Sequence, residues 1–560
     1  MVGQKKWNID IKWIVILAIV AFLLIFEVFP LFYLLIKSLF SGGSFSWEAY
    51  RRVYTYDLNW IALKNTMITA GFTTIFGVAI AFPLAFLVGR TDMYGKKFFR
   101  TLFVVTYMVP PYVGAMAWLR LLNPNAGVLN KFLMKIFGLG SAPFNIYTTS
   151  GIVWVLTCFF YPYAFITISR AMEKMDPSLE EASRISGASP LKTLFKVTIP
   201  MMTPSIIAAG LLVFVASASA YGIPSIIGAP GQIYTVTMRI IDFVHIGSEE
   251  GLTDAMSLAV FLMLISNVIL YISTFVVGKR QYITMSGKST RPNIVELGKW
   301  RLPITIIISI FSFFVIILPF ITVAITSFTV NMGKPLTLSN LSLKAWEKVF
   351  SRASIISSTT NSFLTATAAA FFGILISCVM AYLLQRTNVK GKRIPDFLIT
   401  LGSGTPSVTI ALALIISMSG KFGINIYNTL TIMVVAYMIK YMLMGMRTVV
   451  SAMSQVHPSL EEAAQISGAN WLRMLKDVTL PLIGASIVAG IFLIFMPSFY
   501  ELTMSTLLYS SNTKTIGYEL YIYQTYHSQQ VASALATAIL LFVILVNYIL
   551  NKLTKGQFSI

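Results

Sequence analysis

The chain has 560 residues, of which 56% are hydrophobic and 11% charged. Its mean hydropathy of +0.77 excludes an ordinary soluble domain and indicates a polytopic membrane protein. The net charge of +21 would favour nucleic acid in a soluble chain, but the basic residues gather in short loops beside apolar runs. This placement indicates membrane topology and no nucleic-acid partner.

Apolar segments of about 20 residues predict twelve membrane spans and an all-α fold. They lie near 12–39, 61–88, 101–122, 150–170, 203–222 and 253–277, and then near 303–328, 356–384, 395–418, 430–449, 483–500 and 532–551. About 27 Lys and Arg fall on the side of the termini and about 15 on the other, which predicts that both termini are cytoplasmic. Each half has six spans, an even number, so both halves enter the membrane from the same side and are predicted to be parallel repeats.

The clearest repeat is polar. The segment Pro177–Pro200 (loop 176–200) returns as Pro458–Pro481 (loop 457–481), with about 15 of 24 positions identical. Each copy predicts a cytoplasmic helix–turn–helix. Ser178-x-x-Glu181 and Ser459-x-x-Glu462 have the spacing of capping boxes, although Asp176 with Pro177 is an equally good start for the first copy.

The turn and the end of each copy also follow from residue type. Gly187 and Gly468 are expected to break the helix, since glycine tolerates left-handed backbone and close approach. Ser189 with Pro190, and Asn470, are expected to cap a second short helix. Pro200 and Pro481 are expected to end that helix.

The repeat extends over the chain. Asn65 matches Asn361 and Pro110 matches Pro406 at an offset of 296, whereas the polar loops match at 281. The first half therefore has about 15 extra residues, which we place in the external loop Asn123–Thr149. The predicted organisation is a first repeat at 1–278, a cytoplasmic linker at 279–301 and a second repeat at 302–560.

No nucleotide-binding motif accompanies these repeats. Ser286-Gly287-Lys288-Ser289-Thr290 in the linker imitates the end of a phosphate-binding loop, but Tyr282 stands where the first glycine is needed. Two cytoplasmic hairpins without a nucleotide site indicate a separate ATPase partner that acts as a dimer.

The hairpins carry a family resemblance. Glu181-Ala182-Ser183-x3-Gly187 and Glu462-Ala463-Ala464-x3-Gly468 resemble the EAA motif of permease subunits of bacterial ABC importers, and the chain resembles a fused pair of type I importer permeases. The resemblance implies that the first short helix of each hairpin binds an ABC ATPase subunit, with Glu181 and Glu462 facing basic residues there. The residues implied in coupling are Glu180, Glu181, Ala182, Gly187, Glu461, Glu462, Ala463 and Gly468.

Three residues are candidates for the translocation path. Lys440 is an ionisable residue within a span, where charge is costly, so it contacts substrate or pairs with a carboxylate or carbonyl. The stretches that begin at Tyr221 and Glu501 resemble those of the ferric-iron importer permeases, although Tyr500 replaces the lysine expected before Glu501. Ferric iron is the first expectation for the cargo; phosphorylated sugars, phosphonates and thiamine-like solutes are alternatives within the same machinery.

The expected chain is not an enzyme and holds no cofactor or metal, since ATP and Mg would be bound by a homodimer of ATPase subunits. An external substrate-binding protein is expected at Gly231–Gly251 and Ser510–Gln530; the alternative is that these segments are interfacial helices on the lipid headgroups. The main rival is an ion-coupled secondary transporter, which the small supply of intramembrane acids, Glu27 and Glu501, disfavours. A structural scaffold is the third possibility.

Overall fold

The computed structural model describes residues 11–41, 43–173, 175, 178–279, 294–331, 334 and 337–553. This part of the chain is almost entirely helical, and one short hairpin pairs β1 (Phe40–Ser41) with β2 (Ser44–Phe45). Most of the predicted linker, including the Ser286–Thr290 segment, lies outside the described residues.

The first repeat contains these helices: α1 (Ile11–Leu23), η1 (Leu24–Val28), α2 (Phe29–Lys37), α3 (Glu48–Thr55), α4 (Asp57–Arg90), α5 (Lys96–Met108), α6 (Pro111–Leu122), α7 (Val128–Phe137), α8 (Thr149–Glu173), α9 (Ser178–Ile185), α10 (Pro190–Thr193), η2 (Leu194–Thr198), α11 (Ile199–Ala218), η3 (Pro224–Gly228), α12 (Val236–Ile246) and α13 (Glu249–Lys279). The second contains η4 (Gly298–Trp300), α14 (Arg301–Ser312), η5 (Phe313–Ile317), α15 (Leu318–Thr326), η6 (Leu338–Asn340), α16 (Lys344–Ser351), α17 (Ala353–Arg386), α18 (Arg393–Gly404), α19 (Ser407–Ser417), α20 (Leu430–Met453), α21 (Pro458–Ile466), α22 (Trp471–Met474), η7 (Leu475–Thr479), α23 (Leu480–Phe499), α24 (Thr503–Leu508), α25 (Ile516–Tyr526) and α26 (Gln529–Leu553).

Ten helices among the described residues are long and apolar enough to cross a membrane, and two bent pairs bring the total to twelve. The all-α polytopic prediction is confirmed, but two predicted spans are not continuous. The chain bends by 104° between α5 and α6 and by 107° between α18 and α19. Each bend lies at a proline, Pro110 before α6 and Pro406 before α19. Proline interrupts the helix because it has no amide hydrogen to donate to the preceding turn.

The prediction that Pro200 and Pro481 end a helix is wrong. The helix passes through each proline by way of a wider π-turn, η2 or η7, in which Ile199 N–H donates to Leu194 O and Leu480 N–H to Leu475 O. The wider turn accommodates the missing amide hydrogen of the proline that follows. The second arm of each hairpin therefore continues into α11 or α23 rather than forming a separate short helix.

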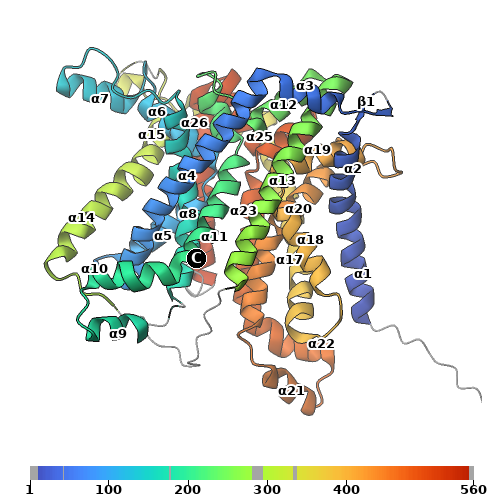
Figure 1. Ribbon diagram of the computed structural model, residues 1–560. Coiled ribbons are helices and arrows are strands. Elements are labelled where there is room, and N and C mark those ends of the chain that lie inside the picture. The colour runs from blue at the N-terminus through green and yellow to red at the C-terminus, as the bar shows by residue number, and fades with distance from the viewer. Residues whose placement is uncertain are drawn as a thin grey trace, which may run out of the picture.

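The two repeats share one internal packing scheme and interlock. In the first repeat α4, α8 and α11 pack together, and in the second α17, α20 and α23 do the same. The first span of each repeat crosses to the other, so that α2 packs on α19 and α15 packs on α6. Figure 1 shows the result, with α9 and α21 protruding from one end of the helical body and α3, α7 and α12 at the opposite end.

Candidate functional site: paired hairpins and the seam between repeats

Two polar hairpins, which contain α9 and α21, protrude from the same end of the body (Figure 1). We call Ser178–Thr198 the first hairpin and Pro458–Thr479 the second. The turns are made as predicted, because Gly187 and Gly468 take φ values of +83° and +87°, the left-handed region that glycine enters without strain. The caps of the second arms are also as predicted.

Those caps use side-chain oxygens. Ser189 Oγ accepts the amide of Lys192 at 3.3 Å, and Asn470 Oδ1 accepts that of Arg473 at 2.9 Å. At the start of the second hairpin the predicted capping box is wrong, since His457 is the N-cap and its Nδ1 accepts the amide of Ser459 at 3.3 Å. The histidine thus satisfies the amide of Ser459, whereas the predicted box would have satisfied that of Glu462. For the first hairpin, the capping-box residues Ser178 and Glu181 lie in α9, whereas the alternative start at Asp176 and Pro177 lies outside the described residues.

The first glutamate of each pair points into the protein. Glu180 and Glu461 are buried, each accepting a hydrogen bond from a threonine of the second arm, Thr198 at 2.7 Å and Thr479 at 3.0 Å. Each also faces an arginine from the end of a long span. These two residues join the hairpin to the membrane body rather than to an external face.

Arg90 Nη1 lies 3.6 Å from a Glu180 oxygen, and Arg386 Nε lies 3.1 Å from a Glu461 oxygen. Both arginines end helices that begin at the opposite end of the molecule, α4 and α17. Sequence reasoning missed them, although Gly89-Arg90-Thr91 and Gln385-Arg386-Thr387 stand at matching places in the repeats. Each ion pair therefore joins a hairpin to the end of a full-length span.

The second residue of each motif is exposed. Glu181, Ala182, Glu462 and Ala463 lie on the open face of α9 and α21. The same face carries Ile185 and Ile466, each 87% exposed. A large apolar side chain exposed at the tip of a polar hairpin, at the same position in both repeats, is typical of a protein-binding surface.

Lys440 lies where the helix breaks in the second repeat. Its ammonium group donates to the carbonyl oxygens of Ser403 at 2.9 Å and Thr405 at 2.8 Å, at the end of α18. Protein carbonyls are one of the partners that the sequence left open for Lys440, and a contact with substrate stays a prediction. A cation at a helix C-terminus is also favoured by the helix dipole.

Glu501 is buried directly after α23. One carboxylate oxygen accepts the amides of Met504 at 2.8 Å and Ser505 at 3.1 Å, and so caps the start of α24. Ser505 Oγ in turn lies 2.8 Å from the hydroxyl of Tyr437, a residue one turn from Lys440 on α20. Lys440 and Glu501 thus belong to one wall of the second repeat.

The repeats meet along a seam rich in tyrosine, which includes Tyr107, Tyr112, Tyr221, Tyr500 and Tyr521. Tyr112 OH donates to the carbonyl oxygen of Tyr500 at 3.0 Å, and Tyr107 OH lies 3.5 Å from the sulfur of Met444. Tyr221, the third path candidate, is buried and its hydroxyl meets that of Tyr521 at 3.3 Å. Each of these contacts joins the first repeat to the second, between residues that are 300 or more positions apart in the chain.

Glu27 is buried in η1 against the second repeat. A Cβ on Gly402 of α18 would lie 2.8 Å from its carboxyl carbon, and neither of its carboxylate oxygens has a hydrogen-bond partner among the described residues. Glu27 packs between repeats, away from the tyrosine seam.

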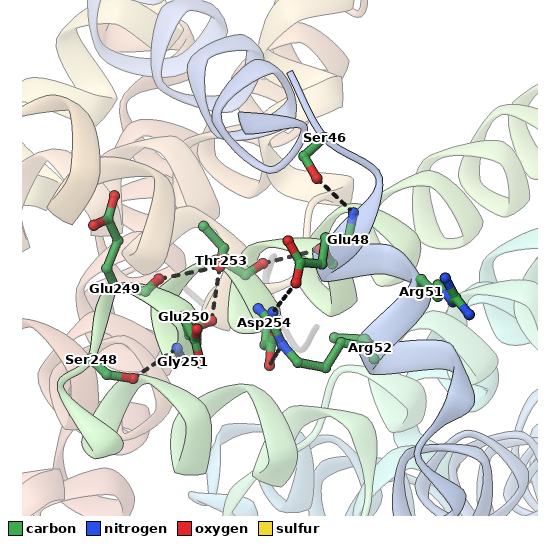
Figure 2. Close-up of polar contacts among 12 residues, drawn as sticks. Ser46, Glu48, Arg51, Arg52, Ser248, Glu249, Glu250, Gly251, Thr253 and Asp254 are labelled. Atoms are coloured by element: carbon green, nitrogen blue, oxygen red, sulfur yellow. Dashed lines mark hydrogen bonds and ion pairs between the residues drawn. The ribbon is translucent and has the colours of Figure 1, made fainter. Parts of the chain in front are cut away.

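At the end opposite the hairpins, the first repeat has a charged clamp. Figure 2 shows Arg52 of α3 reaching Asp254 of α13. Its Nη2 donates at 2.7 Å and its Nε at 3.1 Å, and these hydrogen bonds raise the pKa of Arg52. Ser248 Oγ accepts the amide of Gly251 beside the exposed Glu249 and Glu250.

The predicted docking segments form α12 and α25, whose apolar residues are mostly buried, so they are not helices lying freely on headgroups.

Interlocked repeats, ten long apolar helices (twelve with the bent pairs) among the described residues, and two hairpins joined to them by ion pairs indicate a polytopic membrane permease. The chain belongs to the family described as the binding-protein-dependent transport system inner membrane component, which matches residues 81–281 and 373–556. It is thus a multi-pass membrane protein of ABC importers.

Curated relatives match over most of the chain. The chain is 27% identical over 520 residues to "Putative ferric transport system permease protein FbpB 1" of Haemophilus influenzae, covering 90% of this chain and 79% of the relative. It is 25% identical over 545 residues to "Ferric transport system permease protein FbpB" of Actinobacillus pleuropneumoniae, covering 96% and 77%. A shorter match, 33% over 149 residues, covers 26% of this chain and 29% of "Maltose/maltodextrin transport system permease protein MalF" of Klebsiella aerogenes.

Proposed function

We propose that this chain is the permease of an ATP-driven importer of ferric iron, and that the iron is delivered by an external binding protein. The main support for ferric iron as the substrate is the similarity to two ferric transport permeases along nine-tenths or more of the chain. The shorter similarity to a maltose permease supports the machinery but not a sugar cargo.

The seam supports a hard cation. Ferric ion prefers oxygen ligands, and the seam places the phenol oxygen of Tyr112 against the backbone carbonyl of Tyr500, the residue before Glu501. The carbonyl partners of Lys440 explain the presence of a cation in the spans without an anionic cargo. Glu501 and Tyr221 are the residues that we assign to the path, and Lys440 to its support.

The energy source is a dimer of ATPase subunits that hydrolyses ATP with Mg outside this chain. One subunit seats on each hairpin, with Ile185 or Ile466 in a groove and Glu181 or Glu462 against basic residues. Both hairpins and both termini are then cytoplasmic, in the inner or plasma membrane of a bacterium. The apolar side chains exposed at matching positions support this assignment.

Proteoliposomes that contain the permease, its ATPase and its loaded binding protein test the proposal. Ferric uptake is expected only with ATP, and no ion gradient should drive uptake by the permease alone. Gradient-driven uptake without ATPase would identify a secondary transporter. ATP-dependent uptake of a phosphorylated sugar, phosphonate or thiamine in place of iron would support the importer assignment but refute ferric iron as its substrate.

The path assignment has its own test. Glu501→Gln keeps an acceptor for the cap of α24 but removes the charge, so ferric uptake should fall about tenfold, an order-of-magnitude figure for one lost charge–cation contact. Lys440→Met should change uptake less, because its partners are carbonyl oxygens. Unchanged uptake in the Glu501 variant would remove this residue from the path.

A further inference from the structure

The connection between α6 and α8 holds a helix that the second repeat lacks. Residues 123–148 join α6 to α8 and include α7, whereas residues 418–429 join α19 to α20 without a helix. The sequence placed about 15 extra residues here but predicted only a loop. The segment is therefore the main difference between these corresponding connections of the two repeats.

This connection is rigidly built. The side-chain amide of Asn130 donates to the carbonyls of Leu122 at 3.1 Å, Asn123 at 3.0 Å and Phe144 at 2.8 Å, and its oxygen accepts the amide of Phe144 at 3.2 Å. Asn123 Oδ1 accepts two further amides of the turn before α7. A buried asparagine bonded on both sides holds α7 in one orientation, so its exposed face is a built surface.

That face combines an apolar and a basic stripe. Val128, Phe132 and Ile136 are 52%, 57% and 57% exposed and recur every fourth residue. Lys131 and Lys135 are exposed at the same spacing along the neighbouring stripe. Residues 121–172 contain no Asp or Glu, so the basic charge is not neutralised locally. A basic edge beside an apolar stripe is typical of a helix that lies in the headgroup layer of a membrane.

The position of α7 agrees with this interpretation. Figure 1 shows it at the edge of the body, at the end opposite the hairpins, lying outward of the bundle and above α14. The span that includes α14 and α15 is the least buried of the ten spans, with 28% of its apolar window inside the protein. Helix α7 thus lies at the edge of the body, beside the span whose apolar residues are most exposed.

We propose that α7 is an interfacial helix that binds anionic phospholipid headgroups of the outer leaflet through Lys131 and Lys135, with Val128, Phe132 and Ile136 inserted among the acyl chains. The lysine stems cover apolar surface while their ammonium groups reach the phosphates. This contact would hold the edge of the first repeat against the lipid. It leaves α12 and α25 free for the binding protein.

Photo-crosslinking of the full chain tests the proposal. A benzoylphenylalanine replaces Phe132 in vesicles of equal parts phosphatidylcholine and phosphatidylglycerol. Lipid adducts enriched in phosphatidylglycerol are expected. The same probe at Ile307, on the exposed face of α14, should give lipid adducts without enrichment, and at Ile185, on the tip of the first hairpin, none.

The double variant Lys131→Gln with Lys135→Gln should lower the enrichment by about fivefold for each lysine. Lys421→Gln, in the shorter connection of the second repeat, is the matched control and should leave it unchanged. The proposal is overturned if the Phe132 probe reacts equally with both lipids, fails to reach lipid, or reacts with the binding protein when that protein is added.

Discussion

The two hairpins share their sequence motif and fold but differ in how tightly they are held. In the second hairpin Arg386 bonds to Glu461 and also donates to the carbonyls of Met453 at 3.2 Å and Val456 at 2.6 Å. In the first, the guanidinium nitrogens of Arg90 make no hydrogen bond to another described residue. The same pair of residue types therefore forms a strong lock in one repeat and a loose ion pair in the other.

The two arginines also differ in their backbone surroundings, since the end of the linker lies beside the residues that follow α4. Val295 N–H donates to the carbonyl of Arg90 at 2.8 Å, and Leu297 N–H to the carboxylate of Asp92 at 2.9 Å. The linker that joins the repeats is thus packed against the lock of the first repeat. Duplication preserved the motif, while the connection needed to fuse the copies changed the surroundings of one of them.

The helix breaks show the same inequality. The break after α18 is bonded by Lys440 and by Asn267, whose amide donates to Thr405 Oγ1 at 3.1 Å. At the break after α5, Asn547 reaches the sulfur of Met108 at 3.2 Å, and Phe159 stands at the repeat position of Lys440. We infer that the first repeat is the more deformable half.

The largest effect is expected from the arginines. Arg386→Met should lower the free energy of unfolding by about 3 kcal/mol, because it leaves Glu461 and two carbonyls without their donor. Arg90→Met should lower it by only about 1 kcal/mol, since that guanidinium is already poorly bonded. Denaturant unfolding in detergent measures both. Arg473→Met removes an exposed pair and is the control, at below about 0.5 kcal/mol. Equal losses for Arg386 and Arg90 would contradict the inequality.

The break of the second repeat is the next test. Lys440→Met leaves the carbonyls of Ser403 and Thr405 without a donor, and removal of a buried cation offsets part of that loss, so a net destabilisation of about 1–2 kcal/mol is expected. Lys440→Arg keeps donors and should retain most of the stability. Thermal unfolding distinguishes the variants, and an unchanged midpoint for Lys440→Met would show that the break needs no cap.

The glycine turns should respond equally. A Cβ at Gly187 or Gly468 would meet no atom within 4 Å, so only the left-handed backbone opposes a side chain. Alanine should cost about 1 kcal/mol at either position, and asparagine less, because it tolerates this conformation. The comparison of unfolding midpoints in the two repeats checks this equality; a large difference would reveal an additional contact of one turn.

The smallest effect on stability, but not on coupling, is expected at the exposed glutamates. Glu181→Gln and Glu462→Gln should each change the free energy of unfolding by less than about 0.5 kcal/mol, since both side chains are exposed. On the proposed function, each should weaken ATPase binding by about fivefold. The buried neighbours Glu180 and Glu461 are the matched controls and should lose stability on the same substitution. ATPase binding unaffected by both exposed variants would refute the assigned contact.

Local chemistry allowed much of this protein to be predicted from sequence. Apolar runs set the number of spans because a bilayer admits little else, and the duplicated Gly187 and Gly468 marked turns because few residues accept their backbone angles. The resemblance of the hairpins to a permease motif indicated the family, which the comparison with known families confirmed. These features depend on residues that are neighbours in the chain.

Tertiary structure decided what depends on distant partners. Adjacent helix positions differ by about 100° in direction, so only packing shows that Glu180 faces Arg90 while Glu181 faces outward. The sequence did not show that the carbonyls at the helix break accept from Lys440, or that Glu501 caps α24. The sequence could not show these roles, because each is set by a backbone group whose position depends on how the two repeats interlock.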